Sequence, residues 1–262
     1  MPIIPVKRSL IPAADWSIRL FGTMLQETYD LPGIGGYKLS AYSALEGDWN
    51  ERLKEAQHYG DVYQTNNGTR KPLILDGQKF GNDPAVHVLI GALEAAKDKG
   101  FAAVILYPFA SPVVQYEVTE AAKRIGMPLI VGGKFTCSYH TEGGPKDDFY
   151  TAIFERLGLP DMDGYISESA ADRIYMLAAR QGVTAFSLPG NDLKFSKRMK
   201  EKLDKEVADP EYFAPGFRRQ GGSIREAIRV FENFHAFVGR ELTEADDMRS
   251  AAIKLIAELE AA

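Results

Sequence analysis

The segment that decides the fold runs from Lys71 to Val131 and reads KPLILDGQKFGNDPAVHVLIGALEAAKDKGFAAVILYPFASPVVQYEVTEAAKRIGMPLIV. Three short apolar runs alternate in it with two stretches of helical apolar spacing; the runs are Lys71–Leu75, Ala102–Tyr107 and Pro128–Val131, and the helical stretches are Val86–Lys99 and Val114–Ile125. Short continuous apolar runs are typical of parallel strands that are buried on both faces. A glycine follows each helical stretch, as is common at helix ends. The segment therefore predicts parallel strands joined by helices.

The same alternation continues on both sides of this segment. Further strands are predicted at Ser9–Ala14, Gly36–Ala41, Ala185–Leu188, Tyr212–Ala214 and Ala236–Val238, and further helices at Trp16–Tyr29, Asp48–His58, Glu168–Arg180, Phe195–Lys205, Ser223–Glu232 and Glu244–Glu260. About eight strands, each followed by a helix, predict an α/β fold of the single (β/α)8 TIM-barrel class. A doubly wound open sheet is the alternative that this pattern leaves open.

We expect residues 1–262 to form one barrel domain. One connection is longer than usual for such a fold, at Ser138–Gly164, and it begins with the polar sequence SYHTEGGPKDD. We interpret it as an excursion from the barrel that carries a short helix at Asp148–Leu157.

Composition narrows the class of protein. The hydrophobic fraction of 45% is ordinary for a globular chain and excludes a disordered or fibrous protein. The formal net charge of −5 disfavours a general nucleic-acid binder, because phosphate binding needs clustered positive charge. The single cysteine, Cys137, excludes an internal disulfide and a cysteine-based metal site.

The chain contains no apolar run of the ~18 residues that span a bilayer, and its start is too short and proline-broken for a signal peptide. We expect a cytoplasmic protein without nucleic-acid or membrane partners.

Charged residues follow several of the predicted strands. Asp15 ends the first, Lys38 lies on the second, and Asp76 ends the third, with Lys79 and Asp83 just beyond it. The carboxyl ends of barrel strands form the active site in this fold, so Lys38, Asp76, Lys79 and Asp83 are predicted to meet at one rim. Charges gathered there are costly unless they are paired, and such a cost often marks function. The alternative is that they are separate, solvated loop residues.

A second candidate site lies after the last two strands. The turn PGFRRQGG (Pro215–Gly222) follows the seventh strand, and Gly239 and Arg240 follow the eighth. Barrels often bind phosphate at these two loops. The backbone N–H groups of Gly221 and Gly222, together with the Arg240 guanidinium, are expected to cradle a phosphate group. The alternative is a tight turn with a surface arginine.

Together these segments resemble the orotidine 5′-monophosphate decarboxylase family. FAPGFRRQGGSIREAI and HAFVGREL are similar to the family's S-P-G-x-x-x-Q-G-G-D and I-V-G-R-x-I stretches, and LILDGQKFGNDP is similar to its D-x-K-x-x-D-I-P motif, closest to a branch that reads D-H-Q-K-x-x-x-D-I-P. IPAAD and GYKLS fit the family's first-strand aspartate and second-strand lysine. Each interval in Asp76–Lys79–Asp83 is one residue longer than in the commonest pattern, and Pro84 stands where an isoleucine is usual.

The resemblance implies decarboxylation of orotidine 5′-monophosphate to uridine 5′-monophosphate, in pyrimidine biosynthesis, with no cofactor and no metal. It implies a catalytic array of Lys38, Asp76, Lys79 and Asp83, in which Asp76 faces the substrate carboxylate and Lys79 protonates the carbanion. It also implies a homodimer with shared active sites, in which Asp83 reaches the neighbouring subunit's site.

The implied substrate contacts are divided along the nucleotide. Asp15 and Lys38 would bind the ribose hydroxyls. Thr136 takes the place of a serine that reads the pyrimidine. The phosphate would lie at the two C-terminal turns, where the implied substrate-binding residues are Pro215, Gln220, Gly221, Gly239 and Arg240.

Two other functions stay open. Mg²⁺-dependent sugar-phosphate decarboxylases and synthases of the same barrel superfamily carry an acidic metal ligand on the second strand. Here that strand offers Lys38, and the nearest acid is Glu46. The second alternative is a non-catalytic nucleotide-binding barrel.

Overall fold

The structure is a computed structural model that describes residues 2–15, 18–41, 50–51, 53–54, 57–58, 61, 70–78 and 80–261. Of the helix expected over Asp48–His58, the described residues 50–51, 53–54 and 57–58 are helical and the others lie outside the described residues, as do Trp16 and Lys79.

Eight parallel strands close into a barrel in sequence order. The strands are β1 (Arg8–Ala14), β2 (Tyr37–Ser40), β3 (Leu73–Asp76), β4 (Ala103–Leu106), β5 (Leu129–Gly132), β6 (Ala185–Ser187), β7 (Glu211–Ala214) and β8 (Phe234–Val238). Closure comes from pairing of β1 with β8, from Arg8 opposite Phe234 to Pro12 opposite Val238. The predicted barrel is confirmed, and the open-sheet alternative is excluded, because no strand in the described chain is left as an edge.

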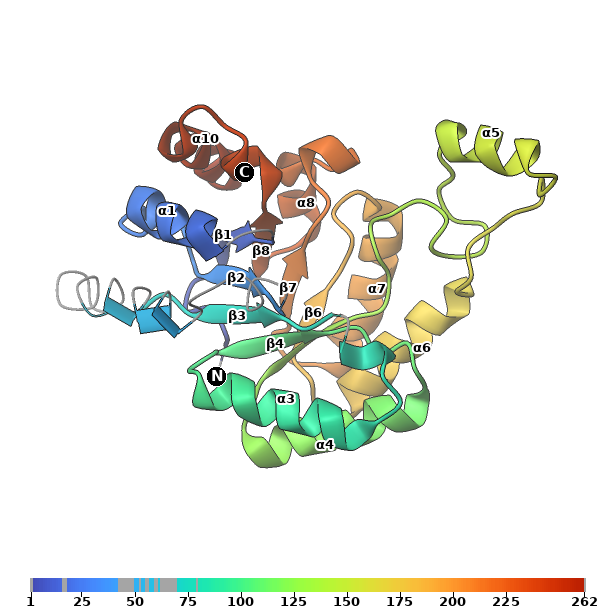
Figure 1. Ribbon diagram of the computed structural model, residues 1–262, viewed down its shortest axis with the longest axis horizontal. Coiled ribbons are helices and arrows are strands. Elements are labelled where there is room, and N and C mark those ends of the chain that lie inside the picture. Colours follow the sequence, from blue (N-terminus) through green and yellow to red (C-terminus); the bar gives the residue numbers. More distant parts are fainter. Residues whose placement is uncertain are drawn as a thin grey trace.

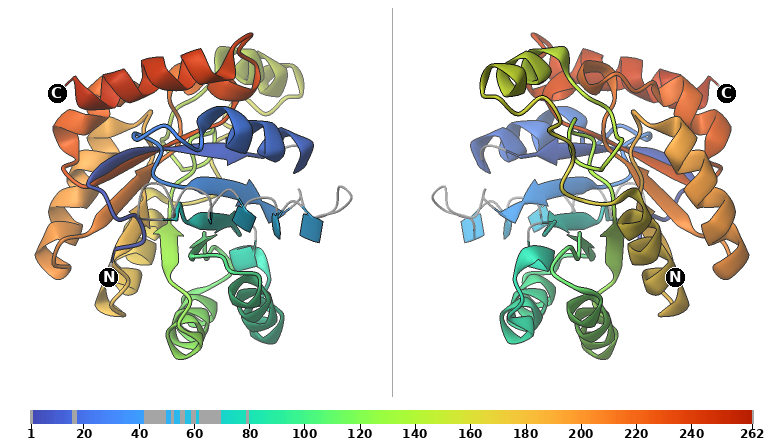
Figure 2. Two further views of the ribbon diagram at one scale, coloured as in Figure 1. Left: turned by 90° about the vertical axis from the view of Figure 1, so that its left-hand side faces the viewer. Right: turned by 90° about the vertical axis from the view of Figure 1, so that its right-hand side faces the viewer.

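Helices surround the barrel (Figures 1 and 2). They are α1 (Ile18–Thr28), α3 (Val86–Asp98), α4 (Pro112–Ile125), α5 (Asp148–Arg156), α6 (Glu168–Arg180), α7 (Leu193–Glu206), α8 (Ile224–Val230), α9 (Arg240–Thr243) and α10 (Met248–Glu260), with 3-10 turns η2 (Phe80–Asn82) and η3 (Arg218–Gln220). The sequence did not predict α9, which is a single turn and too short to show a helical period. No helix in the described part of the chain is long and apolar enough to cross a membrane.

The core has two layers, which explains why the strands are apolar on both faces. Inward side chains fill the barrel itself, among them Ile11, Ile74, Ile130, Phe213 and Phe237. Their sequence neighbours point outward and pack beneath the helices in a second, larger cluster. Because side chains alternate across a strand, each apolar run supplies both layers.

The excursion is present and carries α5, which lies away from the barrel (Figure 1). Its base is closed by a parallel bridge between Thr141 and Ile166, with the Glu142 N–H donating to the Ile166 carbonyl at 2.9 Å. No residue of α5 is buried.

A polar cluster closes the end of the barrel opposite the strand carboxyl ends. Glu211 is buried, and its carboxylate accepts the backbone N–H groups of Ile3 at 2.7 Å and Ile4 at 2.9 Å. Beside it, His235 is fully buried, with its Nδ1 bonded to the Ser9 hydroxyl at 2.9 Å. Burial lowers the pKa of His235 to about 3, so its 3.7 Å contact with Glu211 is not an ion pair at neutral pH.

This burial makes stability depend on acid. The unfolded chain protonates His235 near its ordinary pKa of 6.5, whereas the folded chain does so only near 3. The stability that neutral His235 contributes is therefore complete above pH 6.5 and is lost as the pH falls toward 3. The slope from this one group is at most about 1.4 kcal/mol per pH unit. We expect His235→Asn to flatten the free energy of unfolding, measured by urea titration, between pH 6 and pH 4.

His87→Asn is the matched control, because His87 is exposed on α3. It should keep the wild-type slope. If the His235 variant also keeps that slope, other groups cause the acid sensitivity.

Candidate active site

A cavity of about 450 Å³ opens at the carboxyl ends of the strands. Every strand contributes to it, either at its end or in the loop that follows. The lining residues are Ala13, Asp15, Lys38, Asp76, Gln78, Ile105, Tyr107, Phe135, Thr136, Ser187, Pro215, Gly216, Phe217, Gln220, Phe237, Gly239, Arg240 and Glu241. This is the place where barrel enzymes carry their active sites.

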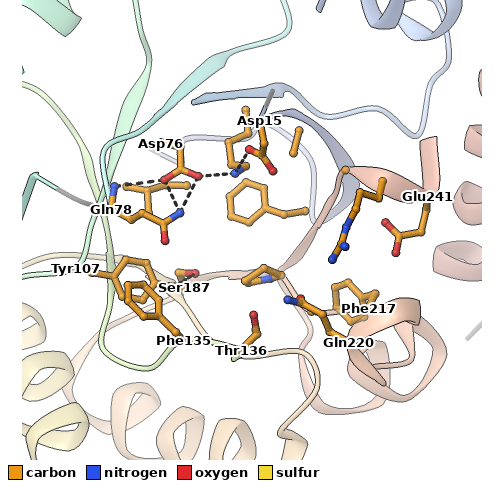
Figure 3. Close-up of a pocket in the computed structure, with 18 residues that line it drawn as sticks. Asp15, Asp76, Gln78, Tyr107, Phe135, Thr136, Ser187, Phe217, Gln220 and Glu241 are labelled. Carbon is orange, nitrogen blue, oxygen red and sulfur yellow. Dashed lines mark hydrogen bonds and ion pairs between the residues drawn. The ribbon is translucent and has the colours of Figure 1, made fainter. Parts of the chain in front are cut away.

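Strand register brings three of the predicted charges together. Lys38 lies opposite Ala13 of β1 and Ile74 of β3. Asp15 and Asp76 each follow two residues later, and therefore point to the same inward face. The Lys38 ammonium reaches both carboxylates, which stand two residues beyond its strand neighbours; Figure 3 shows Asp15 and Asp76 beside each other at the cavity.

The three groups form a paired array. The Lys38 ammonium donates to Asp15 Oδ1 at 2.7 Å and to Asp76 Oδ2. The side chains of Lys38 and Asp76 are 9% and 5% exposed, whereas that of Asp15 is 44% exposed. Of the charges predicted to meet at one rim, Lys38 and Asp76 do so and are not separate solvated residues, and Asp15 of the first strand joins them.

The groups of the array keep one another charged. Burial lowers the pKa of Lys38, but the charges of Asp76 and Asp15 outweigh this and raise it above its ordinary value. Burial raises the pKa of Asp76, but Lys38 outweighs this and holds the carboxyl below its usual range. Gln78 contributes too, since its Nε2 lies 2.9 and 3.0 Å from the two Asp76 oxygens. Lys38 and Asp76 are therefore both charged at neutral pH.

The segment after Asp76 turns away from the cavity. Gly81 of η2 lies against β4 so closely that a Cβ there would be 2.2 Å from the Tyr107 carbonyl oxygen. Asp83 follows this turn, is exposed, does not line the cavity of its own chain, and accepts the Ala85 N–H at 2.8 Å. Lys79 lies outside the described residues; its neighbour Gln78 lines the cavity.

The rim of the cavity at the ends of β7 and β8 carries the exposed residues Gln220, which ends η3, and Arg240, which begins α9. Pro215 and Gly239 line it as well, as expected from the sequence.

The expectation for the two glycine N–H groups is not met. The Gly221 N–H donates to the Arg218 carbonyl at 2.8 Å and the Gly222 N–H to the Gly216 carbonyl at 3.0 Å. Both bonds close the turn after β7, and Gly221 does not line the cavity. In this conformation the donors facing the cavity are therefore side chains rather than these backbone groups.

The wall formed by β4, β5 and β6 is uncharged. Tyr107, Phe135, Thr136 and Ser187 line it (Figure 3). Thr136 is fixed by its carbonyl, which accepts a bond from Asn191 at 3.0 Å. Sequence reasoning found Thr136 but missed the other three and Gln78. The sequence does place three of these residues at or just after predicted strand ends, where barrel sites lie. Tyr107 ends AAVILY, Ser187 lies near the end of AFSL and Gln78 lies in DGQK.

The donor set argues against a divalent cation at the array. The Lys38 ammonium occupies the position between Asp15 and Asp76 that such an ion would need. Within the described ranges, no group of three or more His, Cys, Asp or Glu side chains is arranged to hold a metal ion.

Comparison with solved structures supports the fold. The chain is similar to orotidine 5′-monophosphate decarboxylase from Methanocaldococcus jannaschii complexed with inhibitor BMP, with a TM-score of 0.67, 15% identity, and coverage of 97% of this chain and 99% of that one. A second structure of the Methanocaldococcus jannaschii decarboxylase gives a TM-score of 0.63 at 16% identity, covering 96% and 98%. Leishmania donovani UMP synthase gives 0.64 at 15% identity, and the match spans 97% of this chain but 54% of that longer one. No family model matches the sequence, and no curated protein does.

The array makes a prediction about stability. Lys38→Met keeps the length of the side chain but removes the ammonium that pairs with the buried Asp76 carboxylate and with Asp15. Breaking a buried pair in this way costs about 3–5 kcal/mol. We expect a loss of that size in the free energy of unfolding, measured by urea titration at pH 7.

Lys123→Met is the control, because Lys123 forms a surface pair with Glu120 at 2.6 Å. Such pairs contribute up to about 1 kcal/mol. Equal losses of unfolding free energy in the two variants would mean that the buried array contributes no more to stability than a surface ion pair.

Proposed function

We propose that this chain decarboxylates orotidine 5′-monophosphate to uridine 5′-monophosphate. The observation that carries the proposal is one cavity that holds both the carboxylate–ammonium array and, at the ends of β7 and β8, Gln220 with Arg240. A nucleotide monophosphate would place its phosphate at Arg240 and its base against the array, where Asp76 would oppose a carboxylate on the ring. The likeness in fold to orotidine 5′-monophosphate decarboxylases agrees with it.

The substrate would lie across the mouth of the barrel. Its phosphate would bind Gln220 and Arg240, since a guanidinium suits phosphate oxygens through paired donors. Its ribose hydroxyls would bind Asp15 and Lys38. The carboxylate on the pyrimidine would then face Asp76, and Thr136 would contact the pyrimidine from the uncharged wall.

The chemistry is electrostatic. The bond from ring carbon C6 to the carboxylate breaks, CO2 leaves as a neutral molecule, and the electron pair stays on C6. Asp76 disfavours the bound carboxylate relative to the transition state, because like charges repel across a dry gap. Lys79 would stabilise the carbanion and give it a proton. Such fixed charges need no solvent rearrangement during the step, which is the origin of their effect.

This scheme needs neither cofactor nor metal. The competing Mg²⁺-dependent reactions need acidic ligands where this chain has the Lys38 ammonium. The single cysteine suits a reducing compartment, so we place the reaction in cytoplasmic pyrimidine biosynthesis.

The direct test is an absorbance assay for conversion of orotidine 5′-monophosphate to uridine 5′-monophosphate, with and without chelator. We expect turnover that chelator leaves unchanged. Activity abolished by chelator would favour the Mg²⁺-dependent reading. Tight binding of the nucleotide without turnover would favour a non-catalytic barrel.

The proposed active site is shared between two copies of the chain. Asp83 is exposed and absent from the cavity of its own chain, which fits a role in the neighbour's site. A symmetric homodimer is the commonest closed assembly and would let each copy donate Asp83 to the other.

Shared sites predict complementation. Lys79→Ala and Asp83→Ala should each abolish turnover, and Lys79→Ala should still bind uridine 5′-monophosphate. Co-expressed in equal amounts, the two variants form mixed dimers in which one site carries both defects and the other carries none. Activity should return to about a quarter of the wild-type value, because half the dimers are mixed. Inactive mixed dimers, or a fully active monomer in light scattering, would contradict shared sites.

Arg240 is predicted to act on the phosphate alone. Charge-assisted hydrogen bonds contribute roughly 1.5–3 kcal/mol each. Arg240→Ala should therefore raise KM at least about tenfold for the nucleotide, and lower kcat if phosphate binding also orients the ring. Orotidine, which lacks the phosphate, should react equally with variant and wild type.

Arg219→Ala is the matched control, because Arg219 pairs with Glu244 and does not line the cavity. It should leave both substrates unaffected. If Arg240→Ala harms both substrates equally, Arg240 is structural and the phosphate binds elsewhere.

A further inference from the structure

Two hydroxyl groups stand side by side on the uncharged wall of the cavity. The Tyr107 hydroxyl lies 3.0 Å from Ser187 Oγ, and both residues are buried and line the cavity. Asp15 and Asp76 lie on the other side of the cavity from this pair (Figure 3). The charge chemistry described above does not use either hydroxyl.

The pair is held rigidly. The Tyr107 ring lies flat over Gly132, where a Cβ would come within 2.2 Å of the ring. Phe135 packs on the same ring with centroids 4.5 Å apart. The Tyr175 hydroxyl donates to the Ser187 carbonyl at 2.6 Å and fixes the end of β6. Because neighbouring residues already fix both side chains, the pair loses little conformational entropy when a ligand binds, which suits it to recognition.

The pair is also uncharged. Burial raises the pKa of Tyr107 to about 12, so the phenol keeps its proton at neutral pH. Each hydroxyl donates one hydrogen bond and can accept others. If one donates to the other, the pair still offers one free donor and one free acceptor to a ligand.

The order of atoms around a pyrimidine ring matches the order of strands around the barrel. With the ribose on N1 near β1 and C6 facing Asp76 of β3, the opposite atoms C4 and N3 point to β4–β6. Those atoms carry a carbonyl oxygen and an N–H group. The wall that they face presents Tyr107 from β4 and Ser187 from β6.

We propose that Tyr107 and Ser187 bind the imide edge of the pyrimidine and are specificity-determining residues. The N3–H group donates to Ser187 Oγ, Ser187 donates to the Tyr107 hydroxyl, and Tyr107 donates to the C4 carbonyl oxygen. Each hydroxyl then donates once and accepts once, and no polar group of that edge is left without a partner. This inference rests on the proposed function for the ring's orientation.

The test must remove the N3–H group. Because both hydroxyls can rotate, the pair would also accept a 4-amino pyrimidine in the reverse direction, so a cytosine nucleotide does not probe it. 3-Methyluridine 5′-monophosphate does, since its methyl group replaces the donor and meets Ser187. Ribose 5-phosphate lacks the pyrimidine ring, so its affinity reports only on the ribose and phosphate contacts.

Calorimetry would give the dissociation constants of three ligands: uridine 5′-monophosphate, 3-methyluridine 5′-monophosphate and ribose 5-phosphate. Each is measured for wild type, Ser187→Ala and Tyr107→Phe. Wild type should prefer uridine 5′-monophosphate over its 3-methyl analogue at least about tenfold, because a polar group left unpaired is disfavoured. Ser187→Ala should bring that ratio near one, since it removes the acceptor and makes room for the methyl group. Tyr107→Phe should weaken uridine 5′-monophosphate several-fold, and neither variant should change the affinity for ribose 5-phosphate.

Tyr37→Phe is the matched control. Tyr37 is fully buried and its hydroxyl bonds a hydroxyl, that of Thr28 at 2.8 Å, but it does not line the cavity. It should leave all three affinities unchanged. An unchanged ratio in Ser187→Ala, an equal loss for all ligands, or no discrimination by wild type would overturn the inference.

The outcome is separable from that of the proposed reaction. A wild type that shows the expected ratios but does not turn over orotidine 5′-monophosphate would refute the decarboxylase and leave the recognition pair standing. Turnover with an unchanged ratio in Ser187→Ala would do the reverse.

Discussion

The structure of the site depends on one interaction, the placement of the Lys38 ammonium between the carboxylates of Asp15 and Asp76. Two of these three side chains are buried, so each needs the others to stay charged. Their meeting follows from strand register, which sets Lys38 level with Ala13 and Ile74. A slip of one residue in β2 would turn Lys38 toward the helices and leave Asp76 without its partner. The closed barrel therefore fixes the electrostatics of the cavity.

The rest of the cavity is arranged around that array. Charge is gathered at β1–β3 and again at Arg240 and Glu241, while the wall of β4–β6 offers hydroxyls, aromatic rings and the aliphatic Ile105. A ligand with a phosphate and a polar uncharged edge would match the Arg240 region and the wall, while an acidic group on it would be opposed by Asp76 at the array. The arrangement also accounts for the absence of a metal from the proposed mechanism, because a lysine ammonium already supplies fixed positive charge between the carboxylates.

Most of the fold could be predicted from the sequence, because apolar runs and helix-ending glycines are local signals. Helix α6 was predicted with its observed bounds, and β6 within one residue. The meeting of Lys38 and Asp76 could be predicted because strand ends converge in a barrel, and the same rule placed Asp15 at the end of the first strand. The direction of the Gly221 and Gly222 N–H groups could not be predicted, since it depends on how the turn after β7 closes on itself.

The residues of the uncharged wall escaped prediction for a different reason. Tyr107 and Ser187 look like ordinary members of apolar strands, and their pairing depends on the space that Gly132 leaves for the tyrosine ring. That contact joins three strands and has no sequence signature. Asp83 shows the converse, since its motif predicts a site residue while η2 carries it to the surface of its own chain.

We expect this cavity to hold a pyrimidine nucleotide in one orientation. A crystal structure of the protein with bound uridine 5′-monophosphate would show that orientation. The phosphate should lie on Gln220 and Arg240, the ribose on Asp15 and Lys38, and C6 should face Asp76. A nucleotide bound with its phosphate at the array, or outside the cavity, would contradict it.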